Sequence, residues 1–318
     1  MDNISRKDWE IIALLEKDGR ASAAEIGTKI GLSPSTVSRR IDKLLKNKII
    51  SIFPVPNPFK VGNKAKAFIT LNVDSAHLYD ICAVFADNLH VNLIHTNFGS
   101  SNLLMIVNYP SWETLHDFVY SEVAIMPEVR RLNVYFVKNT YKRYYDFDSR
   151  GAEPISLTEE DAGLIKALSH DGRASYEQIA RRLGTSSATV YRRLAALVQN
   201  DIIKVKASVN LSVLGFSSNA YLALHVDAHR RESISRILAE LKEVYIVMTM
   251  VNGFDILVGI HANTPENLHA LIQEKISLLE GVLEVDAYVR AEIVKRYYGV
   301  QLNLANWASE ATTDTGDF

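Results

Sequence analysis

The sequence predicts an α+β protein made of two tandem units, each a winged-type helix-turn-helix bundle of three helices followed by a ferredoxin-like βαββαβ domain. Three observations predict it: a helix-turn-helix pattern near the N-terminus, a repeat at a fixed offset, and a hydrophobic periodicity that changes from helical to alternating within each unit. With 318 residues, 47% of them hydrophobic, the chain can form several cores.

The repeat covers almost the whole chain. The segment Asp-Gly-Arg-Ala-Ser at 18–22 returns at 171–175, an offset of 153 residues. The same offset relates the two Lys-Arg-Tyr-Tyr segments, at 142–145 and 295–298. Because no insertion is needed between these landmarks, the chain is a duplication of one unit of about 150 residues.

The segment 33–46 predicts a helix with one apolar and one basic face. Ser33 is a good N-cap residue and Pro34 suits the first helical position. Apolar residues recur at helical spacing, whereas Arg39 and Lys46 fall on the opposite face. A short amphipathic helix at 24–30 and a glycine-containing turn at 31–33 precede it, which is typical of a helix-turn-helix.

The first helix of each bundle is expected at about 6–17 and 158–170. Ser5 with Asp8, and Thr158 with Asp161, have the spacing of capping boxes. The three prolines within 54–58 predict a stiff linker, since proline suits neither a helix nor a central strand.

Each βαββαβ domain follows from alternating and helical patterns. Strands are expected at 67–73, 91–98, 103–108 and 129–137 with helices at 75–88 and 111–125, and in the second unit strands at 220–227, 244–251, 255–261 and 282–289 with helices at 230–242 and 265–280. This order places both helices on one face of an antiparallel sheet, so the other face needs a partner. An internal pseudo-dimer would cover it within one chain, but we expect a homodimer or higher homo-oligomer in either case.

These patterns divide the chain into five segments. They are a first helix-turn-helix domain (1–53), a first βαββαβ domain (63–145), their second copies (155–205 and 216–299) and a mobile acidic tail (306–318).

Several classes of function are disfavoured. No run of about 18 apolar residues and no signal-peptide core are present, so we expect a cytoplasmic protein without membrane contacts. The single Cys82 excludes an intrachain disulfide, and no histidine pair has the spacing of a zinc site. No nucleophile motif or phosphate loop stands out, so we expect no metal, no cofactor and no catalytic residue, that is, no enzyme. The net charge of −2 says nothing of a local basic surface.

With these motifs the chain resembles the Lrp/AsnC (leucine-responsive and asparagine-synthase, or feast/famine) regulator family, as a tandem member. The resemblance is carried by the segments 18–20 and 33–41 and by Ile49-Ile50. It implies a helix-turn-helix that binds double-stranded DNA, a regulatory domain for an amino acid or similar effector, dimerisation through sheet faces, and transcription control. Lys48 and Asp201 stand where the family usually has glycine.

The resemblance also implies the residues that contact DNA. They are Ser35, Thr36, Ser38, Arg39, Arg40, Lys43 and Lys46 in the first unit, and Ala188, Thr189, Tyr191, Arg192 and Arg193 in the second. Residues 33–48 carry five basic side chains and one acid, but residues 186–201 carry two and one. We therefore predict that the second helix-turn-helix binds phosphates more weakly.

The family's effector loop, of the type Gly-x-aromatic-Asp, has two counterparts here. Asn252-Gly253-Phe254-Asp255 keeps the aromatic residue and the acid, whereas the first unit has Gly99 and Asn102. An aspartate can pair with the ammonium of an amino acid and backbone amides with its carboxylate, so we expect the effector in the second unit.

Two other functions fit the same modules. Tetrapyrrole (siroheme) decarboxylases look similar in architecture, but they need no basic reading helix. An architectural DNA-coating protein would bind DNA with little sequence preference. The Lys-Arg-Tyr-Tyr segments are expected to close the regulatory domains rather than to bind nucleic acid.

Overall fold

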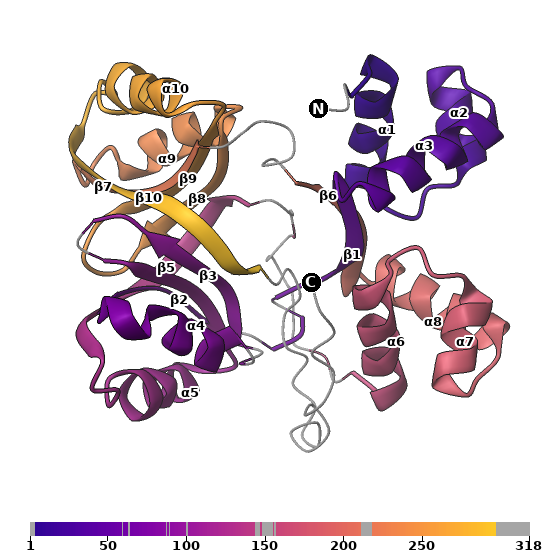
Figure 1. Cartoon of the computed structure of the whole chain (residues 1–318), viewed down its shortest axis with the longest axis horizontal. Coiled ribbons are helices and arrows are strands. Elements are labelled where there is room, and N and C mark those ends of the chain that lie inside the picture. Colours follow the sequence, from indigo (N-terminus) through magenta and orange to yellow (C-terminus); the bar gives the residue numbers. More distant parts are fainter. Residues whose placement is uncertain are drawn as a thin grey trace.

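The structure is a computed structural model that describes residues 4–58, 60–62, 64–86, 88, 90–99, 101–143, 147, 155, 157–210 and 218–296, without the side chains of His170 and Arg296. It has two lobes (Figure 1): both helix-turn-helix bundles form one lobe and both βαββαβ domains form the other. The expected tail at 306–318 lies outside the described residues.

The two helix-turn-helix bundles begin as the capping patterns predict. The Ser5 hydroxyl accepts from the Asp8 amide and the Asp8 carboxylate accepts from the Ser5 amide, and Thr158 and Asp161 repeat this box. Ser33 caps the reading helix, with Pro34 at its first position. The helices are α1 (Arg6–Lys17), α2 (Ala23–Ile30) and α3 (Pro34–Lys46), repeated as α6 (Glu159–His170), α7 (Tyr176–Leu183) and α8 (Ser187–Gln199).

The proline-rich segment corrects one expectation. Most of the expected linker is a strand, β1 (Ile50–Pro56), which pairs antiparallel with β6 (Ile203–Val209) of the second unit. The amide of Asn57 donates to the carbonyl oxygen of Ile202, the residue just before β6, so by alternation Pro54 and Pro56 direct their nitrogens away from β6. The prediction was wrong because a two-stranded ribbon has only edge strands, where proline is tolerated.

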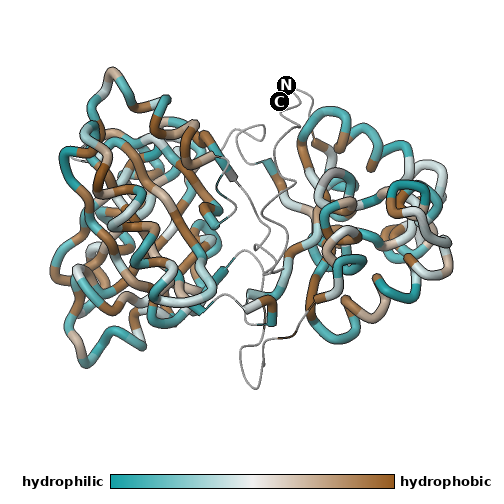
Figure 2. The backbone as a smooth tube through the Cα atoms, turned by 90° about the horizontal axis from the view of Figure 1, so that it is seen from below, coloured by the Kyte–Doolittle hydropathy of each residue, from teal (hydrophilic) through white to brown (hydrophobic). Residues whose placement is uncertain are grey.

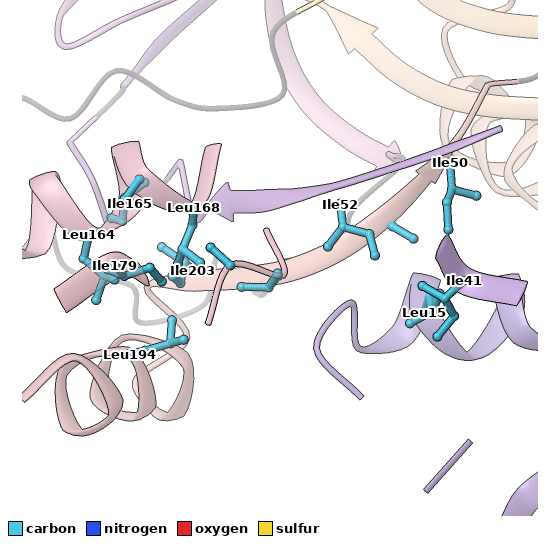
Figure 3. Close-up of a cluster of buried hydrophobic side chains, with 14 of the residues drawn as sticks. Leu15, Ile41, Ile50, Ile52, Leu164, Ile165, Leu168, Ile179, Leu194 and Ile203 are labelled. Carbon is cyan, nitrogen blue, oxygen red and sulfur yellow. The ribbon is translucent and has the colours of Figure 1, made fainter. Parts of the chain in front are cut away.

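The β1–β6 ribbon joins both bundles into one core. α1 packs on β6 of the second unit and α6 packs on β1 of the first, so each bundle is completed by the strand of the other. Figure 3 shows this continuous cluster. Its labelled members are Leu15, Ile41, Ile50 and Ile52 from the first unit, and Leu164, Ile165, Leu168, Ile179, Leu194 and Ile203 from the second.

The repeated Asp-Gly-Arg segments clasp the two bundles together. The Arg20 guanidinium donates to the carbonyl oxygens of Gly172 (2.8 Å) and Ala174 (3.1 Å), and Arg173 donates to those of Gly19 (2.8 Å) and Ala21 (3.2 Å). The close approach requires glycine, because a Cβ at residue 172 would lie 2.4 Å from the Ile52 carbonyl oxygen. The most recognisable repeat in the sequence is therefore a reciprocal interface between the units.

The second lobe contains the two βαββαβ domains. Their helices are interrupted: α5 and α10 each continue as a π-helical segment instead of the single long helix expected. The first unit contains β2 (Ala65–Val73), η1 (Ser75–His77), α4 (Leu78–Ala86), β3 (Val91–Asn97), β4 (Leu103–Tyr109), α5 (Trp112–Asp117), η2 (Phe118–Val123) and β5 (Val129–Lys142). The second contains β7 (Ser218–Val226), α9 (Arg231–Glu240), β8 (Val244–Met250), β9 (Ile256–Ala262), α10 (Pro265–Ala270), η3 (Leu271–Ile276) and β10 (Val282–Arg296).

The two sheets close into one barrel with the strand order β10-β3-β4-β2-β5-β8-β9-β7. β5 pairs first with β2 and then with β8, and β10 pairs first with β7 and then with β3. Both strands therefore run past their expected ends at 137 and 289, because their second halves join the sheet of the other unit. In Figure 2, apolar stretches follow the strands of this lobe.

The sheet faces opposite the helices cover each other. Phe68 is fully buried between the sheets, with ring centroids 5.6 Å from Tyr221 and 6.2 Å from Phe254. The alternate residues of β2, such as Ile69 and Leu71, pack under the helices. The internal pseudo-dimer thus forms, and the bare sheet face no longer requires a second chain.

The lysines of the two Lys-Arg-Tyr-Tyr segments form hydrogen bonds between the units where β5 and β10 cross into the opposite sheet. Lys142 donates to the Leu241 carbonyl oxygen at 2.8 Å, and Lys295 donates to that of Asn88 at 2.7 Å. Each lysine thereby ties a crossing strand to the opposite unit. The tyrosines of both segments lie outside the described residues.

Lys48 and Asp201, which replace the family's glycine, have positive φ angles of 53° and 51°. The left-handed conformation costs a non-glycine residue roughly 1–2 kcal/mol, part of which glycine would return through its freer unfolded chain. We expect Lys48→Gly to raise the free energy of unfolding by about 0.5–1 kcal/mol. Urea denaturation followed by circular dichroism measures this, and a lower midpoint would contradict the explanation.

Candidate DNA-reading surface and effector region

The reading helix α3 presents a basic ridge on its outer face. Arg39, Lys43 and Lys46 are exposed and follow each other at spacings of four and three residues, so they lie on one stripe. The opposite stripe, Val37, Ile41 and Leu44, is buried in the shared core. The packing of α3 therefore leaves Arg39, Lys43 and Lys46 toward solvent.

The N-terminal turn of α3 carries the short polar side chains of the predicted set. Ser35 and Ser38 are exposed. The hydroxyls of Ser35 and Thr36 lie 3.2 and 2.8 Å from that of the cap residue Ser33. The hydroxyl groups of this turn suit contacts to phosphate oxygens.

Arg40 and Arg193, both predicted to contact DNA, each bond to the first helix of their own bundle, and DNA contact at these two residues stays a prediction. The Arg40 guanidinium donates to Asp8 at 2.8 Å and to the Ser5 hydroxyl at 3.0 Å. Arg193 makes the same contact with Asp161 at 3.0 Å. Burial opposes ionisation of Asp8, but its hydrogen bonds to Ser5 and Arg40 outweigh it and lower the pKa of this carboxyl. Each arginine fixes its reading helix on the first helix of the bundle.

We expect Arg40→Ala to lower the free energy of unfolding by about 1–2 kcal/mol, because a partly buried charge-assisted hydrogen bond is lost. The loss should be present near neutral pH and shrink as the pH falls from 3.8, the usual value, through the depressed pKa of Asp8. Denaturation at pH 7 and at a series of pH values below 3.8 measures both. An Arg40→Ala protein as stable as wild type at pH 7 would contradict this role.

The second reading helix offers a different surface. Ala188, Tyr191 and Arg192 are exposed on α8, and Tyr191 is 58% exposed. Thr189 is half-buried, with its hydroxyl 2.9 Å from that of the cap residue Ser186. Cationic side chains are thus sparse where α3 has its ridge.

The two bundles also differ in charge outside their reading helices, and the sequence comparison of residues 33–48 with 186–201 missed this difference. The exposed Arg181 and Arg182 of α7 stand where α2 has Thr28 and Lys29. Over 5–48 the first bundle has ten basic and six acidic residues, while 158–201 has six of each. Comparing the repeats over the whole bundle, rather than over α3 and α8 alone, would have revealed this.

The predicted effector loop of the second unit contacts the first unit. The Asn252 side chain accepts from the Phe136 amide and donates to the Val134 carbonyl oxygen, both at 2.8 Å. Phe254 is buried, 4.6 Å from the Tyr135 ring. Gly253 has φ +80°, and a Cβ there would lie 2.4 Å from the same ring. These three residues form a contact between the two domains.

The acid of this loop and its counterpart are bonded to backbone. Asp255 accepts from the Val226 amide at 3.0 Å, and its other oxygen lies 3.8 Å from Arg231. Asn102 accepts from the Val73 amide and donates to the Val73 carbonyl oxygen. Gly99 is exposed, with φ +107°. Effector binding at these residues stays a prediction.

Within the described parts of the chain, no group of three or more His, Cys, Asp and Glu side chains is arranged to hold a metal ion. None of the helices described is both long and apolar enough to cross a membrane.

Comparison with known proteins follows the same division. The AsnC-type helix-turn-helix domain matches residues 4–45 and again 157–198. The Lrp/AsnC ligand binding domain matches residues 219–300.

Individual relatives match one unit at a time. An uncharacterised HTH-type transcriptional regulator of Pyrococcus furiosus is 29% identical over 143 residues, which are 45% of this chain and 97% of its own. The HTH-type transcriptional regulator FL11 of Pyrococcus abyssi is 29% identical over 129 residues, 40% of this chain and 85% of its own.

Solved structures of one protein, NirDL, match the tandem arrangement as a whole. The siroheme decarboxylase NirDL superposes with a TM-score of 0.66, covering 92% of this chain and 93% of its own at 18% identity, a level that shows a shared fold. The helix-turn-helix matches in both units and the ligand-binding-domain match show the family. The chain belongs to the Lrp/AsnC family of helix-turn-helix transcriptional regulators, as a member with two helix-turn-helix repeats.

Proposed function

We propose that this chain reads an asymmetric operator through two unequal helices held by one polypeptide, and that a small metabolite modulates this binding. The observation that carries the proposal is the exposed cationic ridge of α3, formed by Arg39, Lys43 and Lys46, on a helix whose other face is anchored in the core. Such a helix supplies both phosphate contacts and side chains for base edges.

The internal pseudo-symmetry supports a bipartite site. α3 and α8 belong to one rigid lobe, fastened by the β1–β6 ribbon and the reciprocal Arg20 and Arg173 contacts. A single chain therefore presents two readers, an arrangement that ordinarily needs two subunits. The homodimer stays a prediction, and light scattering tests it: twice the chain mass of 35.6 kDa, or a multiple of it, is expected.

The unequal charge of the two bundles supports unequal half-sites. α3 has a basic ridge, whereas α8 exposes Tyr191 and Arg192, so it relies more on apolar and hydrogen-bonding contacts. Competition between selected operator and random duplex tests the proposal. An affinity for the operator at least about a hundredfold higher than for random duplex indicates a regulator. Equal affinity for both indicates a DNA-coating protein and contradicts the proposal.

The NirDL likeness favours a second candidate, a tetrapyrrole decarboxylase, because it extends over both units in the same order. A second NirDL structure carries an iron-uroporphyrin III analogue, so that protein accommodates a tetrapyrrole. An absorbance titration with iron-uroporphyrin III separates the two functions. A saturable spectral shift with iron-uroporphyrin III, together with release of carbon dioxide from siroheme, would support the decarboxylase, and an unchanged spectrum with operator binding supports the regulator.

A further inference from the structure

The two regulatory domains differ at the last residue of two matching strands, β4 in the first unit and β9 in the second, where only the first unit has an aromatic side chain. In the first unit, Tyr109 at the end of β4 stacks on His90 and Phe118, with ring centroids 4.3 and 5.1 Å apart. Its hydroxyl accepts a hydrogen bond from Asn88 at 3.2 Å. The ring is buried and fills the space between β4 and the π-helical segment η2.

The second unit has Ala262 at the matching position, 153 residues later. A cavity of about 540 Å³ opens there, within the range of pockets that hold small molecules. Its apolar floor is formed by Ala262, Ala270 and Leu271. The duplicated chain thus supplies an internal comparison: the same fold is filled by a side chain in one unit and hollow in the other.

The cavity is lined by two lysines at positions where the first unit has none. Lys242 and Lys275 line it, and the residues that match them are Leu89 and Glu122. Lys275 lies 3.1 Å from Glu243, whose side chain is 23% exposed. The remaining polar side chains of the rim are Glu274, His261, Asn263 and Asn267.

The charges are balanced, so the cavity suits a molecule that carries both signs or a single carboxylate. Two lysine ammonium groups offer charge-assisted hydrogen bonds to a carboxylate, and Glu243 and Glu274 face a positive group. Burial lowers the pKa of His261, although Glu243 opposes that shift. The lowered pKa favours the neutral imidazole, which can donate or accept a hydrogen bond.

We propose that this cavity binds a small carboxylate with a bulky apolar group, which occupies the place that the Tyr109 ring fills in the first unit. The carboxylate pairs with Lys242 and Lys275, and the apolar group lies on Ala262, Ala270 and Leu271. An α-amino group, next to Glu243 and Glu274, strengthens binding. The claim that this molecule is the effector rests on the proposed function. Its binding to the cavity does not require DNA.

Isothermal titration calorimetry of the full chain with L-phenylalanine, L-leucine and 3-phenylpropionate tests the proposal. At least one probe is expected to bind wild type. Ala262→Tyr, which copies the residue of the first unit into the cavity, is expected to weaken binding by at least about tenfold. If 3-phenylpropionate binds as tightly as L-phenylalanine, the carboxylate and ring suffice; if it binds more weakly, the acidic rim recognises the amino group.

Matched variants keep the test sharp. Lys275→Gln should weaken binding several-fold even if Ala262→Tyr fails to fold, whereas the exposed Lys138→Gln, with the same charge change far along β5, should leave it unchanged. Absence of binding by folded wild type, or wild-type binding by both cavity variants, overturns the inference. Operator binding measured on the same samples separates the claims: intact DNA binding without probe binding refutes only the cavity, and the reverse refutes only the proposed function.

Discussion

Arg39→Ala is expected to weaken operator binding by about tenfold or more, while Arg192→Ala costs less than about threefold. Arg39 lies at the centre of the basic ridge of α3, so its loss removes a contact from a surface that already dominates the electrostatic attraction. Arg192 lies on a helix with few neighbouring cations. If Arg39 meets a phosphate, the slope of log affinity against log salt also falls by about one for Arg39→Ala.

A salt-titrated fluorescence anisotropy assay measures both variants on one duplex. The matched pair Arg39→Lys and Arg192→Lys is the control, since each keeps its charge but loses the planar fork needed for bidentate base contacts. Equal losses for the two alanine variants would show that both readers contribute alike and would contradict the asymmetry.

Gly172→Ala is expected to lower the free energy of unfolding by about 3 kcal/mol. The added methyl group would lie 2.4 Å from the backbone oxygen of Ile52 and 2.8 Å from its Cγ2 atom, and the backbone cannot withdraw without breaking the clasp. The hydrogen bond from the Gly172 amide to the same oxygen, at 3.0 Å, would be lost as well. Guanidinium denaturation followed by circular dichroism measures the effect.

Gly163→Ala is the matched control in the same unit. Residue 163 lies within α6, where alanine is favoured over glycine, and its Cβ would meet only the flexible end of Leu183 at 3.1 Å. Its stability is expected to stay within about 1 kcal/mol of wild type. Equal stabilities for Gly172→Ala and Gly163→Ala would show that the clasp does not depend on this close approach.

The local elements could be predicted from the sequence because each depends on neighbouring residues. The cap at Ser33, the boxes at Ser5 and Thr158, and the alternation of β2 all involve contacts within a few residues. Because the chain is duplicated, the same patterns could be found in both units. They located every strand of the second regulatory domain. The reading helix and its basic face were predictable for the same reason.

The contacts between units could not be predicted, because they join residues about 150 positions apart. The residues around Pro54 do not indicate that β6 pairs with this segment. Those around Lys142 do not indicate that β5 continues into the sheet of the other unit. Arg40 matched the family's reading helix, but a partner 32 residues away holds its guanidinium. The cavity at Ala262 emerges only when its buried neighbours are known.

Selection of binding sites from random duplex DNA by the purified full chain tests whether α3 and α8 read unequal half-sites. We expect an enriched site with one sharply defined half, read by α3, and a second, weakly defined half, read by α8. The Arg39→Ala protein should lose the sharp half and keep little enrichment. No enrichment over random DNA, or a symmetric palindrome with two equally defined halves, would contradict this expectation.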